Sequence, residues 1–83
     1  MSAESLLPSL PVEPRPGRYR HYKGRDYRVI GIARHSETLE PLVVYQALYD
    51  ERGLWVRPAS MFTELVRDNA GQRVPRFTFI AAD

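Results

Sequence analysis

The sequence predicts an all-β protein, built as a small, strongly bent antiparallel barrel of five to six short strands. Short runs rich in Val, Ile and Tyr follow one another and are bounded by Gly, Pro and acidic turn residues. No segment carries a sustained apolar stripe at helical spacing. The 83 residues can hold one small domain, and a domain of this size buries only about 60% of its unfolded surface. Such a thin core leaves no room for a deep cofactor cleft.

Five runs have the composition of β-strands, and each lies between turn residues. They are residues 18–23, 27–35, 42–49, 54–57 and 76–80. The segment from Pro58 to Val66 is ambiguous, because Pro58 could begin a short helix there. We favour a short helical turn at 58–60, followed by a strand over 62–67 that folds back through 68–71 onto residues 73–74.

Charge determines the register of the first hairpin. A three-residue loop at 24–26 places Tyr19 and Val29 on one face. A two-residue loop would turn Arg18 and Arg20 toward that face, which is the expected interior, and would bury unpaired charge. The favoured register therefore gathers a row of polar and aromatic side chains on the outer face, with Gly31 marking a bend or bulge. This row consists of Arg18, Arg20, Tyr22, Arg28 and Arg34.

Short strands joined by tight turns suit an SH3-like barrel, because curling the sheet removes its exposed edges. An OB-like barrel is the alternative, weakened by the lack of an evident helix between the third and fourth strands. We assign residues 17–83 to the single barrel domain. Residues 1–16 hold four of the seven prolines and few apolar side chains, which predicts a disordered tail.

Composition excludes several classes of protein. The chain has no Cys, so it has no disulfide framework, no cysteine zinc site and no thiol nucleophile. Its longest apolar runs are far shorter than the roughly 20 residues that a membrane-spanning helix needs. The N-terminus lacks the basic and apolar regions of a signal peptide. We expect a cytoplasmic protein without membrane association.

Several motifs have the order and spacing of a known family. They are GRYRHYKG at 17–24, HSET at 35–38, VVY at 43–45, LWVRP at 54–58 and VPRF at 74–77. This pattern resembles the small bacterial family called domain of unknown function 1653, over about residues 17–80. The resemblance implies a compact β-barrel. The family has no established activity, so the resemblance supplies no catalytic residues.

The densest chemical cluster is the loop His35-Ser36-Glu37-Thr38. Acid–base chemistry needs a His beside a carboxylate, and His35 and Glu37 are two residues apart. The structural interpretation, which we favour, is that Ser36 and Thr38 close the turn by hydrogen bonds to the backbone. A small enzyme or metabolite-binding domain centred on this loop is the alternative.

A metal site would have to use His21, His35 and a carboxylate such as Glu37. In the favoured register His21 faces Val29 and lies about 20 Å from His35. We therefore expect neither a metal site nor a cofactor, and we name no catalytic residue.

Two surfaces could bind a partner. The arginines of the outer row could hold phosphates bidentately while Tyr22 stacks on a base. Tyr45, Tyr49 and Trp55 could line an aromatic groove, although such residues also fill small cores, and Arg57 could stack on Trp55. We expect a non-enzymatic binding module for a nucleic acid, a phosphorylated ligand or a protein partner. The oligomeric state is left open.

Overall fold

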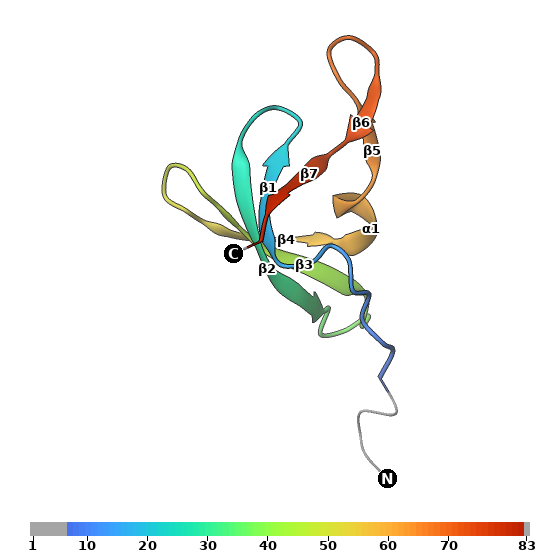
Figure 1. Cartoon of the computed structure of the whole chain (residues 1–83). Helices are drawn as coiled ribbons and strands as arrows, with labels where there is room; N and C mark the ends of the chain where they lie inside the picture. The colour runs from blue at the N-terminus through green and yellow to red at the C-terminus, as the bar shows by residue number, and fades with distance from the viewer. Residues whose placement is uncertain (1–6, 83) are drawn as a thin grey trace.

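The structure, a computed structural model, describes residues 7–82 and is all-β with one short helix (Figure 1). Five strands form one antiparallel sheet in the order β4-β3-β2-β1-β7, and β5 pairs with β6 in a separate hairpin. The elements are β1 (Gly17–His21), β2 (Asp26–Arg34), β3 (Pro41–Ala47), β4 (Leu54–Pro58), α1 (Ala59–Phe62), β5 (Leu65–Arg67), β6 (Arg73–Pro75) and β7 (Phe77–Ala81). The predicted all-β class is confirmed.

The sheet is not closed into a barrel within the described part of the chain, because β4 and β7 are both edges. The chain passes from one edge to the other through α1 and the β5–β6 hairpin. Since β5 and β6 pair with each other, no strand joins the two edges by hydrogen bonds. The structure thus supports a small antiparallel all-β fold and does not confirm the SH3-like barrel. No helix among residues 7–82 is long and apolar enough to cross a membrane.

The segment after Pro58 confirms one expectation and corrects another. The predicted fold-back is present as the hairpin of β5 and β6, in which Leu65 lies opposite Pro75. The first strand of this hairpin was expected to start at residue 62. Instead, Ala59–Phe62 form one helical turn and β5 begins at Leu65. The helical turn is favoured here because it carries Phe62 into the core, where the side chain is only 1% exposed.

The first hairpin has the expected faces but a different turn. Tyr19 lies opposite Tyr27, and both side chains contact the core. The His21 N–H donates to the Arg25 carbonyl at 2.8 Å, so the turn comprises residues 22–24 and not 24–26. The expected pairing of His21 with Val29 is therefore wrong. The side chains still lie on the expected faces of the hairpin, because the two registers differ by an even number of residues.

A β-bulge changes the course of β2. The register between β2 and β3 shifts by one residue around Ile30, beside Gly31, where a bend was expected. Beyond the bulge Ile32 lies opposite Val43, which is fully buried on the core face. Arg34 follows Ile32 by two residues and shares its side of the strand. The expected place of Arg34 in the outer row is wrong, because the extra residue reverses the alternation of faces.

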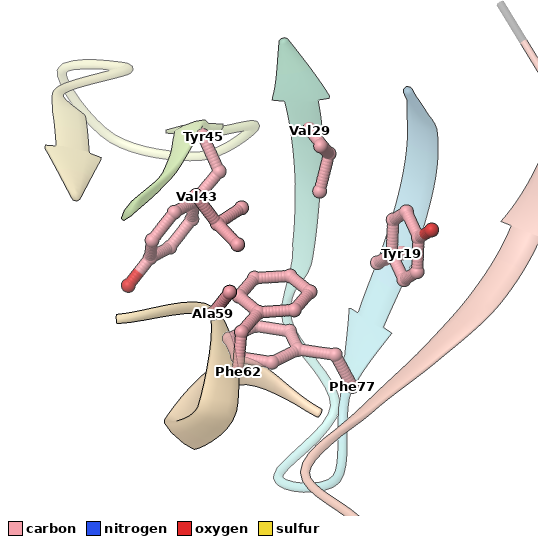
Figure 2. Close-up of a cluster of buried hydrophobic side chains, with 7 residues drawn as sticks. All are labelled: Tyr19, Val29, Val43, Tyr45, Ala59, Phe62 and Phe77. Atoms are coloured by element: carbon pink, nitrogen blue, oxygen red, sulfur yellow. The ribbon is translucent and has the colours of Figure 1, made fainter. Parts of the chain in front are cut away.

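The core lies between the concave side of the sheet and α1 (Figure 2). The rings of Phe62 and Phe77 stack in parallel with their centroids 4.0 Å apart. The Tyr19 and Tyr45 rings meet Phe62 edge-on at 5.6 and 5.4 Å. The buried residues of this cluster are Tyr19, Val29, Val43, Tyr45, Ala59, Phe62 and Phe77. Aromatic contacts thus connect the helix to β3, β1 and β7 of the open sheet.

Residues 7–16 form neither helix nor strand, but they contact the domain. The Arg34 guanidinium donates to the Pro8 carbonyl at 2.9 Å, and the Tyr19 hydroxyl donates to the Arg15 carbonyl at 2.8 Å. The Arg15 guanidinium also lies 3.8 Å from the centroid of the Phe79 ring. The disorder expected for residues 1–16 stays a prediction, and residues 1–6 lie outside the described part.

Candidate functional site

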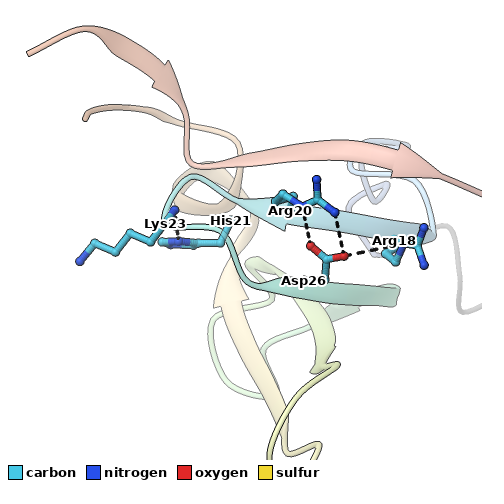
Figure 3. A network of polar contacts seen from close by, with 5 residues as sticks. All are labelled: Arg18, Arg20, His21, Lys23 and Asp26. Atoms are coloured by element: carbon cyan, nitrogen blue, oxygen red, sulfur yellow. Dashed lines mark hydrogen bonds and ion pairs between the residues drawn. The ribbon is translucent and has the colours of Figure 1, made fainter. Parts of the chain in front are cut away.

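Three arginines of the predicted row share the outer face of the first hairpin. Arg18 and Arg20 come from β1 and Arg28 from β2, and all three are exposed. Asp26 lies among them and forms two hydrogen bonds with Arg20, at 2.8 and 3.3 Å (Figure 3). Its carboxylate is 4.0 Å from the Arg18 Nε. We call Arg18, Arg20 and Arg28 the outer arginines.

Asp26 orients Arg20 and lies near Arg18. The hydrogen bonds from Arg20 are the main reason that the pKa of Asp26 is lowered, so the carboxylate is ionised at neutral pH. Because the pair is exposed to solvent, it contributes little to stability. Its chief effect is to hold the Arg20 guanidinium along the strand, beside the groove described next.

A groove of about 420 Å³ opens between the turn of the first hairpin and the β5–β6 hairpin. Both hairpins extend toward the same end of the molecule (Figure 1). The groove is lined by Arg20, His21, Tyr22, Gly24, Asp68, Val74, Pro75, Thr78 and Ile80. A second hollow, of about 630 Å³, shares Tyr22 and Asp68 with it and adds Lys23, Asn69 and Ala70. We call the two together the hairpin groove.

His21 and Tyr22 form an aromatic wall of the hairpin groove. Their ring centroids are 4.7 Å apart and the planes are tilted by 35°. The His21 Nδ1 accepts the Lys23 backbone N–H at 3.1 Å, which fixes the imidazole in the turn (Figure 3). Burial, helped by the positive charges of Arg76, Lys23 and Arg57, lowers the pKa of His21. The imidazole is therefore neutral at pH 7, and its ring also meets the Phe77 and Tyr27 rings edge-on.

The opposite wall is the tip of the β5–β6 hairpin. The Asp68 Oδ1 accepts the backbone N–H groups of Ala70 and Gln72, each at 2.9 Å. Gly71 has φ +79°, a conformation that side chains disfavour, and its carbonyl accepts a hydrogen bond from Arg67 at 2.8 Å. The conformation of the turn is therefore held by hydrogen bonds within the hairpin itself. Its acidic group serves mainly to shape this wall.

The base of the β5–β6 hairpin is held by Arg76. Its guanidinium donates to the Glu64 carboxylate at 2.5 Å and to the Met61 carbonyl at 3.2 Å. The Tyr22 N–H also donates to the Arg76 carbonyl at 2.9 Å. Arg76 thus connects both walls of the hairpin groove to α1.

The loop at His35 has the geometry of a closed turn. The His35 Nδ1 accepts the backbone N–H groups of Glu37 and Thr38 at 3.0 and 3.3 Å. The Thr38 hydroxyl accepts the Glu40 N–H at 3.3 Å. These contacts support the structural interpretation of the loop in part: Thr38 accepts a backbone hydrogen bond as expected, but the other acceptor is the His35 imidazole and not Ser36. Arg57, which was expected to stack on Trp55, instead donates to the Tyr45 hydroxyl at 3.4 Å.

The three aromatic residues of the second predicted surface separate. Tyr45 is 6% exposed and belongs to the core. Tyr49 and Trp55 line a hollow of about 590 Å³ at the end of the β3–β4 hairpin. The Tyr49 hydroxyl is hydrogen-bonded to the Tyr27 hydroxyl, while Trp55 is 58% exposed.

Residues 7–82 contain no group of three or more His, Asp or Glu side chains that could hold a metal ion.

Sequence reasoning identified one wall of the hairpin groove and missed the other. Arg20 and Tyr22 were singled out as binding residues, and both line the groove. The fold-back at 68–71 was predicted from its turn residues. No signal in the sequence indicated that its tip, with Asp68, would lie across from Tyr22, because that depends on how α1 docks.

The fold and the groove define a small antiparallel all-β domain with an open groove between two hairpins. The chain belongs to the family described as protein of unknown function, DUF1653, whose model matches residues 17–79. The resemblance inferred from the motifs is confirmed. The structure is similar to the crystal structure of a protein of the same family from Bordetella bronchiseptica, with 41% sequence identity and a TM-score of 0.77. That match covers 86% of this chain and 92% of the other. No curated protein matches the chain.

Proposed function

We propose that this domain is a non-enzymatic module that binds single-stranded nucleic acid along the outer arginines and in the hairpin groove. One observation carries the proposal. Arg18, Arg20 and Tyr22 follow one another along the outer side of β1 and its turn, and the last two line the groove. A row of cations that leads to a partly exposed aromatic ring such as Tyr22 is the arrangement by which proteins hold a nucleic-acid backbone and stack its bases.

The outer arginines supply the phosphate contacts. A guanidinium presents several donors in a plane and can bind a phosphate with two parallel hydrogen bonds. Arg20 is oriented by Asp26, and its side chain is about half exposed, so it can turn from that carboxylate toward a phosphate. Lys23, in the second hollow, adds a cation over the Tyr22 ring, 5.8 Å from its centroid.

The hairpin groove supplies the base contacts. Tyr22 offers a ring on which any base can stack, and the neutral His21 ring packs against it. Val74, Pro75 and Ile80 provide apolar contact on the other sides. Stacking of this kind does not depend on base identity, so we expect little sequence preference. A nucleic-acid ligand agrees with the cytoplasmic location predicted from the sequence, which stays a prediction.

The test is a titration of the labelled protein with short single-stranded RNA and DNA pools, followed by backbone-amide NMR at low and at higher salt. We expect shifts confined to residues 18–28 and 68–80. If three arginines contact phosphates, the slope of log affinity against log salt is about −2, since each contact contributes about −0.7. Between 50 and 200 mM salt the affinity then falls by roughly 20-fold.

Three variants separate the contributions. Arg20→Ala should reduce the salt slope by about 0.7. Tyr22→Ala should weaken binding by about 1–3 kcal/mol and leave the slope nearly unchanged. Arg73→Ala is the matched control. It removes the same charge from β6, and Arg73 is not among the residues that line either hollow of the hairpin groove.

The proposal is overturned if neither RNA nor DNA shifts these amides at low salt, or if Arg73→Ala weakens binding as much as Arg20→Ala. Shifts with inorganic phosphate or a phosphopeptide, and none with the nucleic acids, would assign the outer arginines to a phosphorylated ligand instead. Shifts confined to Tyr49 and Trp55 with a peptide library would move the site to the β3–β4 hairpin.

A further inference from the structure

The edge strand β4 is unprotected and apolar. Leu54, Trp55 and Val56 are consecutive and are 65%, 58% and 59% exposed. β4 pairs with β3 in an unbroken register, so no bulge twists its outer edge away. Exposed edges normally carry a charge, a proline or a bulge that prevents pairing with another chain. In β4 such residues appear only at the end, as Arg57 and Pro58.

The free backbone groups of β4 can be assigned from one hydrogen bond. The Ala47 N–H donates to the Gly53 carbonyl at 3.0 Å, so residues 53, 55 and 57 direct their backbone groups toward β3. The intervening residues direct theirs away from the sheet. Leu54 and Val56 therefore each offer an outward N–H and C=O, and Pro58 offers a C=O only.

The side chains of β4 complement a second copy of the same strand. In an antiparallel pair centred on Val56, this residue lies opposite its own copy and Leu54 lies opposite Pro58 of the second copy. Trp55 lies opposite Arg57 of the second copy, and the two-fold axis repeats this contact. A guanidinium against an indole is a favourable cation–π pair, and the opposite face of the joined strands is apolar. No charge is buried without a partner.

We propose that β4 pairs with β4 of a second copy of this chain about a two-fold axis at Val56, so that two sheets join into one continuous sheet. This is the self-complementary geometry of a two-fold dimer. None of the residues that line the hairpin groove belongs to β4, so each copy keeps its groove open. The proposal is thus independent of the nucleic-acid function.

The first test is the mass of the protein in solution, measured by sedimentation from micromolar to millimolar concentrations. We expect a monomer–dimer equilibrium. Val56→Lys should raise the dissociation constant at least about tenfold, because two ammonium groups meet at the axis and two apolar contacts are lost. Leu65→Lys is the matched control, since Leu65 is 52% exposed on β5, and it should leave the equilibrium unchanged.

The second test identifies the strand. In the dimer the amide hydrogens of Leu54 and Val56 should exchange slowly, and in Val56→Lys the Leu54 amide should exchange at the rate of an exposed group. A sample that mixes labelled and unlabelled protein should show contacts between the Trp55 ring and Arg57 of the second copy. A monomer at every concentration overturns the proposal. So does a dimer in which these amides exchange rapidly, or one that Val56→Lys and Leu65→Lys weaken equally.

Discussion

Replacing Phe62 by alanine tests how the short helix holds this small domain together. Phe62 is 1% exposed and stacks on Phe77 at 4.0 Å, and its ring also meets Tyr19 and Tyr45 edge-on. Truncating a buried Phe to Ala costs about 3–5 kcal/mol. At about 0.05–0.15 kcal/mol per residue, a domain over residues 17–82 has only about 3–10 kcal/mol of stability in total. We therefore expect Phe62→Ala to lose most of the folded population.

The assay is urea unfolding followed by far-ultraviolet circular dichroism, with the free energy of unfolding taken from a two-state fit. Phe62→Leu provides a variant that still folds, because it keeps most of the buried volume and should cost about 1.5 kcal/mol. Met61→Ala is the control on the same helical turn, where the side chain is 42% exposed, and it should change stability by less than about 0.5 kcal/mol. The reasoning is refuted if Phe62→Ala costs no more than Met61→Ala.

Three further predictions concern the backbone and the titrating groups. Gly17→Ala should destabilise the fold by more than about 1 kcal/mol in urea unfolding, because at φ +144° a Cβ would lie 2.7 Å from a β7 carbonyl oxygen. Gly31→Ala is the control: its Cβ meets no atom within 4 Å, so it should cost much less. The lowered pKa of His21 means that the unfolded chain takes up a proton at about pH 6.5 before the folded chain does, so stability is complete above about pH 7 and falls as the pH drops toward the folded pKa. His21→Asn, whose side-chain oxygen can accept the same backbone N–H, should flatten this dependence. The check is the urea midpoint at about pH 7.5 and at about pH 5.5. If the midpoint of the variant falls between these pH values as much as that of the unmodified protein, His21 is not the titrating group. Burial and the hydrogen bond with Tyr49 raise the pKa of Tyr27 to about 12. In an ultraviolet titration, Tyr49→Phe should bring this pKa closer to its ordinary value of 10.0, and an unchanged titration curve would show that the bond has no effect.

The register of the first hairpin shows how far pattern reasoning could reach. The need to keep Arg18 and Arg20 out of the interior correctly assigned the faces of β1 and of the first part of β2. It could not distinguish two registers that differ by an even number of residues, because both put the same side chains on the same face. The turn at residues 22–24 is selected by hydrogen bonds between His21 and Arg25 and between Gly24 and His21.

Arg34 shows where the alternation rule fails. Gly31 was recognised as a bend, but a bulge also adds a residue, and each added residue exchanges the two faces of the strand beyond it. Arg34 therefore lies on the same side of the strand as Ile32 and not in the outer row, and its guanidinium donates to the Pro8 carbonyl. The pattern of residues after Gly31 is compatible with either face, so only the pairing with β3 could decide.

By itself the sequence determined the all-β class, the positions of the strands, the family and the outer arginines, because these depend on local composition and on the alternation of side chains along a strand. Only the tertiary structure decided that the sheet stays open, that Tyr45 belongs to the core while Trp55 is exposed, and that Tyr22 faces Asp68 across a groove. These features arise from the docking of α1 and the β5–β6 hairpin through Phe62 and Arg76. Such contacts join residues far apart in the chain, and they leave no periodic signal in the sequence.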